Sequence, residues 1–96
     1  MPAFVDVRTI VLPLQAPDGI ARVDIESGTV TARVGTTETC RAPHMARVAR
    51  DGRVYVVCEG DHVTAGAVVQ VDPMTLAIVR RWVTGVYPDA VGFGDD

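Results

Sequence analysis

Residues 42–61, APHMARVARDGRVYVVCEGD, contain two apolar segments on either side of Asp51 and Gly52. An Asp-Gly pair between two strand-like segments is one of the strongest short-range signals for a β-hairpin. Val54–Cys58 is a continuous apolar run, as expected for a strand buried on both faces. His44–Arg50 precedes it and alternates imperfectly. The stretch therefore predicts two antiparallel strands joined by a tight turn.

The composition favours an all-β domain and argues against two classes of partner. Apolar residues make up 48% of the 96 residues and aromatics only 5%, so burial depends largely on β-branched side chains that suit pleated sheets. The net charge is -3, and the nine basic residues are scattered rather than clustered, which argues against nucleic-acid binding. No apolar stretch approaches the roughly 20 residues of a membrane span, and no signal-peptide pattern is present.

The chain contains an internal repeat. GIARVDIESGTVTARVG at 19–35 aligns with GAVVQVDPMTLAIVRRWVTG at 66–85, with Asp24 over Asp72 at a spacing of 48 residues. APHMARVARD from residue 42 aligns with YPDAVGFGDD from residue 87, with His44 over Asp89 at a spacing of 45. Repeats of this length are typical of β-propeller blades.

The repeat predicts eight strands in a single unit, 1–96, with repeats at about 4–51 and 53–96. We label the strand that opens with Pro-His or Pro-Asp as A and its successors B, C and D. The order along the chain is then B-C-D-A-B-C-D-A, which is an all-β fold of two four-stranded antiparallel blades. The expected strands are, in order, 4–14, 20–25, 29–34, 44–50, 54–58, 67–71, 77–83 and 87–94.

The succession of Pro-His, strand, Asp-Gly, RVYVV, VVQVD, DPMTLAIV and YPD resembles the YVTN family of β-propeller repeats. RVYVVCEGD stands where that family has its name-giving strand, and the likeness covers roughly residues 17–96. The resemblance implies that strand A, here 44–50 and 89–94, lines a central channel. It also implies an exported or surface-attached protein, periplasmic or extracellular, of a kind that often has no known catalytic activity.

Two blades cannot close a ring, because propellers have about 4 to 8 blades. We expect a homo-oligomer, with a trimer slightly favoured over a tetramer, or else completion by further repeats of a longer parent chain. Either arrangement would cover apolar blade faces and sheet edges that an isolated pair of blades leaves in water.

CRAPH and CEGDH place two Cys-x3-His patterns at one end of the hairpin. With a two-residue loop, Met45 would face Cys58, and side-chain alternation would then send Cys58 and His62 to one face and Cys40 and His44 to the other. A Cys40–Cys58 disulfide requires the least rearrangement. A metal site formed by all four residues needs irregular backbone, and unpaired thiols are the third alternative.

Three functional hypotheses follow. The leading one is a non-enzymatic binding or scaffolding module with no cofactor, whose ligand site lies at the channel mouth and includes His44, Asp89 and Arg47. A second is a lectin-like oligomer that binds glycans, with Trp82 stacking on sugar. A third is a metal-binding or redox enzyme subunit that uses the Cys/His end of the hairpin.

Overall fold

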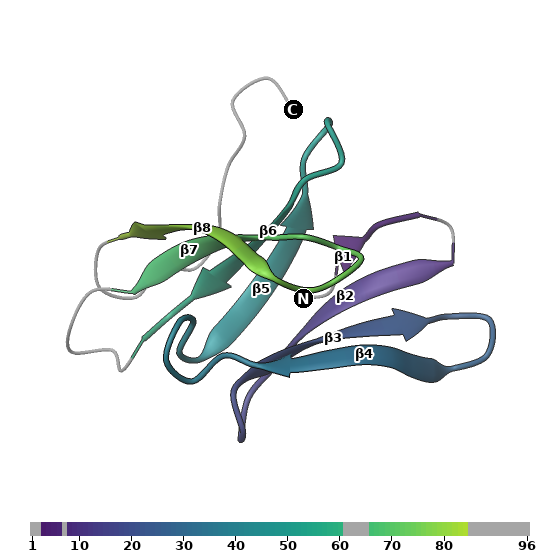
Figure 1. Cartoon of the computed structure of the whole chain (residues 1–96), viewed down its shortest axis with the longest axis horizontal. Coiled ribbons are helices and arrows are strands. Elements are labelled where there is room, and N and C mark those ends of the chain that lie inside the picture. The colour runs from purple at the N-terminus through teal and green to yellow at the C-terminus, as the bar shows by residue number, and fades with distance from the viewer. Residues whose placement is uncertain (1–2, 7, 61–65, 85–96) are drawn as a thin grey trace.

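The computed structural model describes residues 3–6, 8–60 and 66–84, and in them the chain forms two four-stranded antiparallel sheets. These ranges contain no helix. The first sheet has the order β1-β2-β3-β4 and the second β5-β6-β7-β8, so each is a simple meander (Figure 1). The strands are β1 (Ala3–Phe4), β2 (Thr9–Leu14), β3 (Gly19–Asp24), β4 (Thr29–Gly35), β5 (Pro43–Val48), β6 (Val54–Cys58), β7 (Ala67–Val71) and β8 (Ile78–Val83).

The prediction of an all-β, antiparallel fold is therefore confirmed. Two predicted strands, β6 and β7, have the expected bounds, and β3, β4, β5 and β8 differ by one or two residues at an end. The final strand predicted at 87–94 lies outside the described residues, and the division into repeats at 4–51 and 53–96 stays a prediction.

The single strand predicted for residues 4–14 is wrong, because Asp6 breaks it into β1 and β2. The Asp6 carboxylate accepts hydrogen bonds from the backbone N–H groups of Arg8 and Thr9, at 2.8 and 2.9 Å. The Val5 N–H donates to the Thr9 carbonyl at 2.8 Å. A short acidic side chain that bonds backbone two residues ahead favours a turn over a continuous strand. The first sheet therefore has its own short first strand.

The hairpin loop between β5 and β6 has three residues rather than the predicted two. Ala49 and Arg53 close it, and the Gly52 N–H donates to the Ala49 carbonyl at 2.9 Å. Gly52 has φ +88°, the left-handed conformation that ends this common three-residue loop and that glycine adopts without strain. Asp51 accepts a hydrogen bond from the Arg53 N–H. The loop shifts the register by one residue, so Met45 pairs with Val57 and not with Cys58.

A β-bulge at His44 changes the alternation on which the cysteine argument depended. Pro43 pairs with Cys58 and Met45 with Val57, so His44 has no partner of its own in the ladder. Such an extra residue reverses which side chains face inward beyond it. Pro43 is consequently buried and His44 is exposed. The predicted segregation of the cysteines to opposite faces does not hold.

The two sheets repeat each other in their irregularities as well as in their strand order. The β3–β4 ladder shifts register between Arg22 and Val23, and the β7–β8 ladder does so between Gln70 and Val71. These positions are 48 residues apart, as in the sequence repeat. The internal repeat is thus structural, with β1 to β4 corresponding to β5 to β8.

The turns after β3 and β7 match in the same way. The Gly28 N–H donates to the Asp24 carbonyl at 2.8 Å, and the Leu76 N–H donates to the Asp72 carbonyl at 2.7 Å. Gly28 and Leu76 have φ of +69° and +62°. Both aspartates also accept backbone hydrogen bonds from within their turns.

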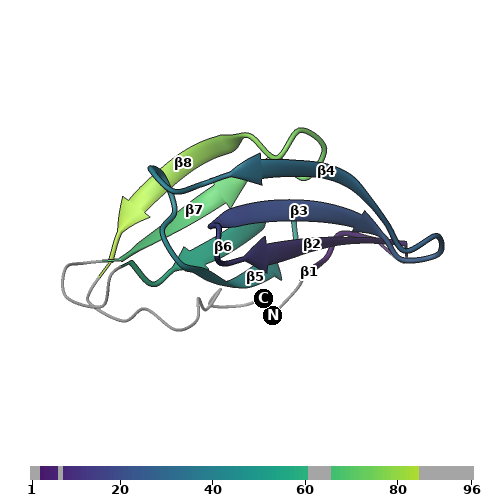
Figure 2. The same ribbon diagram turned by 90° about the horizontal axis from the view of Figure 1, so that it is seen from below.

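The core lies between the two sheets. Alternate side chains of the central strands point into it, as the period of two requires. The sheets approach most closely at their first strands, because β5 lies against β1 and β2 (Figures 1 and 2). Farther out, the Arg81 Nε donates to the Thr39 carbonyl at 2.9 Å. The core residues include Val11, Ile20, Val54, Val56, Val69, Val71 and Leu76.

Candidate functional site

A disulfide joins Cys40 to Cys58 at the start of the second sheet. The Sγ atoms are 2.05 Å apart, the Cα atoms are 5.1 Å apart, and 18 positions separate the residues in sequence. Both residues are buried in the core. The buried Thr36 hydroxyl donates to the Cys40 carbonyl at 2.8 Å, which holds the connection after β4 against the cross-link. Of the three alternatives for these cysteines, the structure contains the disulfide.

Irregular backbone brings the cysteines together, as the sequence argument required. Ala42 and Gly60 have positive φ values of 51° and 75°. The Gly60 N–H donates to the Arg41 carbonyl at 3.0 Å, so the two chain segments stay paired beyond the bulge. The bulge, with the extra residue at 44 next to Pro43, also shifts the strand register between Pro43 and Met45.

The predicted channel-mouth residues are only partly placed. His44 and Arg47 both lie on β5 and are exposed. The His44 Nδ1 lies 3.9 Å from the Glu59 Oε1, a contact that becomes an ion pair when the imidazole is protonated. Asp89 lies outside the described residues, so its place in the channel-mouth site stays a prediction.

The four-residue metal site is incomplete in the same region. Cys40 and Cys58 are joined to each other, and a disulfide sulfur is not the thiolate that zinc binds. His62 lies outside the described residues. Among the described residues, no group of three or more His, Cys, Asp or Glu side chains is placed to hold a metal ion.

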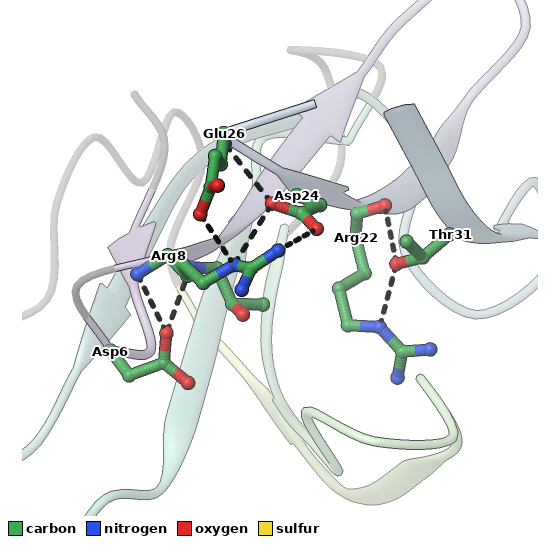
Figure 3. Close-up of polar contacts among 7 residues, drawn as sticks. Asp6, Arg8, Arg22, Asp24, Glu26 and Thr31 are labelled. Carbon is green, nitrogen blue, oxygen red and sulfur yellow. Dashed lines mark hydrogen bonds and ion pairs between the residues drawn. The ribbon is translucent and has the colours of Figure 1, made fainter. Parts of the chain in front are cut away.

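Sequence reasoning missed a pocket of about 300 Å³ where the first sheet meets the turn after β7. Arg22 is one of its lining residues, and Figure 3 shows its side chain beside Thr31. Its Nε donates to the Thr31 hydroxyl at 2.9 Å, and its Nη1 donates to the carbonyls of Pro73 and Met74. The guanidinium therefore joins the two sheets. The pocket is lined by Val5, Asp6, Thr9, Arg22, Asp24, Thr31, Pro73 and Met74.

The carboxylates of this pocket are stabilised in their ionised form. The Arg8 Nη2 lies 3.1 Å from the Asp24 Oδ2, and the Arg8 Nε lies 3.4 Å from Glu26 (Figure 3). The hydrogen bond from the Arg8 side chain, followed by that from the Glu26 N–H, lowers the pKa of Asp24 below its ordinary value. The backbone N–H of Arg8 lowers the pKa of Asp6.

These hydrogen bonds and ion pairs give the polar groups of the pocket a structural role. A carboxylate that already accepts from a guanidinium and from a turn is a weak base, because its charged form is favoured. General acid–base catalysis near neutral pH needs the opposite shift. A signal for the pocket in the sequence is Arg22, a cation between the apolar residues Ala21 and Val23 of β3.

The outward surface of the first sheet is mainly apolar. Phe4, Ile10, Val23 and Val30 pair across β1 to β4 and therefore share one face. Phe4 is 64% exposed and Val30 57%. The exposed Arg33 lies on the same face, in one row with Leu12 and Ala21. We call this surface the first outer face; its large apolar members are Phe4, Ile10, Leu12, Leu14, Val23 and Val30.

The second sheet also has an outward surface with apolar side chains. Tyr55 and Trp82 lie on it with their ring centroids 6.1 Å apart, and Trp82 is 42% exposed. Its polar members are Arg47, Gln70 and Arg80. We call this surface the second outer face; its apolar members are Met45, Tyr55, Val57, Val68 and Trp82, of which Val57 is already fully buried within the chain.

No family model matches the chain, and neither a curated protein nor a solved structure matches it. Within the described residues, the strands alternate with turns and loops, and no helix has the length and apolar character to cross a membrane.

Proposed function

We propose that the chain is a non-enzymatic β-propeller module that scaffolds or binds in the periplasm or at the cell exterior. The observation that carries this proposal is the matching of the two sheets in strand order, bulge and turn at a spacing of 48 residues. Two like sheets that approach at their first strands and separate outward are the geometry of neighbouring blades around an axis. The similarity to YVTN repeats in sequence supports the same interpretation.

A scaffolding role, rather than a catalytic one, is supported by the pocket. The Nε and Nη1 atoms of Arg22 donate hydrogen bonds to a hydroxyl and to backbone carbonyls. Asp6 and Asp24 have lowered pKa values and are occupied by turn N–H groups and Arg8. Arg22 joins the two sheets, and Asp6 and Asp24 hold turns within the first sheet.

The buried disulfide supports the oxidising location. Disulfides persist in the periplasm and outside cells and are rare in the reducing cytosol. Rapid alkylation of the protein in intact cells, before lysis, tests this point. Cys40 and Cys58 should be protected from alkylation until a reductant is added, whereas immediate labelling of both would contradict it.

The propeller itself is tested by the shape of the assembled particle. Electron microscopy of the native particle should show a disc with a central channel and four-stranded sheets arranged radially. A flat stack or a two-layer sandwich would overturn the propeller assignment. In a disc, the ligand site that we propose at His44 and Arg47 would lie at the channel mouth. H44A should then weaken ligand binding without changing the particle.

A second candidate function is glycan binding, and Trp82 favours it. The indole is partly exposed beside Tyr55, and paired aromatic rings offer apolar surface to a sugar ring. Saturable quenching of Trp82 fluorescence by a panel of simple glycans, lost in Y55A, would support this function. Absence of quenching throughout the panel would count against it.

A further inference from the structure

The two outer faces are counterparts of surfaces that are already in contact inside the chain. At the spacing of 48 residues, Val34 of the first sheet corresponds to Trp82 and Ile20 corresponds to Val68. Ile20 is fully buried and Val34 packs against the core between the sheets. Val68 and Trp82 lie on the second outer face. The second outer face thus repeats the inner face of the first sheet.

The converse holds for the other surface. Val23 and Val30, on the first outer face, correspond to Val71 and Ile78. Val71 is in the core, and Ile78 packs against it. The first outer face thus repeats the inner face of the second sheet. The contact within the chain therefore has a direction, and the outward face of each sheet repeats the inner face of the other.

We propose that a second copy of this chain covers these surfaces, with the first outer face of one copy packed on the second outer face of the next. The contact between copies would repeat the contact between the sheets within one copy. This inference deepens the proposed function and rests on it for its ring geometry, but the pairing of faces follows from the observed repeat alone.

The polar bridge between the sheets has a counterpart in this contact. Inside the chain, Arg22 donates to the carbonyls of Pro73 and Met74. The corresponding positions are Gln70 for the donor and Ile25 and Glu26 for the acceptors. Gln70 carries amide donors and is half-buried on the second outer face. It would donate to the turn after β3 of the neighbouring copy.

A contact between two different faces is heterologous, so it propagates from copy to copy until the rotation closes a ring. Three or four copies of a two-blade unit fall within the range of about 4 to 8 blades. We expect the ring to close at three copies.

The test is a pair of single-face variants, V30E and W82E, measured by native mass spectrometry and analytical ultracentrifugation. The wild-type chain should assemble at micromolar concentrations. A carboxylate placed in an apolar contact without a partner should weaken association by about a hundred-fold or more. Each variant alone should therefore be monomeric. Mixed in equal amounts, they should form a dimer of one copy of each, since W82E keeps the first outer face and V30E keeps the second.

Thr37→Glu is the matched control, because it adds the same charge on an exposed connection outside both faces; it should assemble like the wild type. Each variant must retain the disulfide and a β-type circular dichroism spectrum. A monomeric wild type, assembly of either variant alone, or a mixture that fails to pair would overturn the proposal. A mixture that pairs, together with a wild-type particle that is not a disc, would leave the pairing intact and overturn the propeller instead.

Discussion

At the turn that follows the third strand, the first sheet has Gly28 and the second has Leu76. Both residues have positive φ, near +69° and +62°, and both donate to the carbonyl of an aspartate four positions earlier. A β-carbon at Gly28 would meet nothing within 4 Å, whereas Leu76 is 1% exposed and belongs to the core. The aspartate therefore determines the shape of the turn. In the first sheet, Gly28 adopts the positive φ without strain. In the second sheet, Leu76 adopts it and fills the core.

The largest effect is expected from Leu76→Ala. Removing a buried leucine side chain leaves a cavity between the sheets and should lower the free energy of unfolding by about 3 kcal/mol. Alanine at position 76 has the same positive φ and, like leucine, carries a β-carbon. The loss of stability therefore measures packing alone. Urea denaturation gives the value. Met74→Ala, in the exposed part of the same turn, should change it by less than about 0.5 kcal/mol; equal effects of the two substitutions would contradict the role assigned to Leu76.

The disulfide is a second point at which the sheets differ, since Leu14 stands in the first sheet where Cys58 stands in the second. The disulfide links residues that are 18 positions apart in sequence. Removing it in the double variant C40A/C58A should lower the free energy of unfolding by about 3 kcal/mol. Hydrogen exchange should accelerate in β5 and β6 more than in β1 and β2. Uniform acceleration in both sheets would argue that the cross-link does not stabilise the second sheet specifically.

Gly28→Ala should have a smaller effect. The turn has room for a methyl group but keeps positive φ, which costs an L-residue about 1 kcal/mol. Thermal unfolding of G28A beside Ser27→Ala, whose backbone is ordinary, separates conformational strain from the loss of a small residue. A stabilised G28A would mean that the turn relaxes to another conformation.

The smallest effect concerns pH. Because Arg8 lowers the pKa of Asp24 in the folded chain, the proton binds more weakly there than in the unfolded chain. The stabilisation is therefore complete above the ordinary pKa of 3.8 and is lost as the pH falls through the lower folded value. Asp24→Asn should flatten the fall in unfolding midpoint below about pH 4 and leave it unchanged in slope near neutral pH. A wild-type slope in the variant would show that this ion pair has no influence on stability.

The strand pattern was predictable because each strand carries its own signal. Val54–Cys58 and Ala67–Val71 are apolar runs bounded by turn residues, and the alternation that defines a buried face is local in sequence. Breaks that arise from one side chain bonding the backbone were harder to predict. Asp6 interrupts an apolar stretch, and only its hydrogen bonds to the next residues distinguish a turn from a polar position on the outer face of a strand.

The candidate site was less predictable than the fold. The pairing of Cys40 with Cys58 was among the predicted alternatives, but the strand register that allows it was not predicted. An Asp-Gly pair fits a two-residue loop or the last positions of a three-residue loop equally well. The pocket at Arg22 joins the turn after β7 to the first sheet, and such a long-range contact leaves no periodic trace in sequence.

The bulge at His44 has a consequence for how the chain tolerates change. His44 is the exposed extra residue of the bulge, so the bulge requires a residue at this position and does not require an imidazole. We expect many replacements at 44 to keep the Cys40–Cys58 bond, whereas deleting that one residue would restore regular pairing, turn Pro43 outward and move the thiols apart. Closure of this corner depends on the number of residues between 40 and 45.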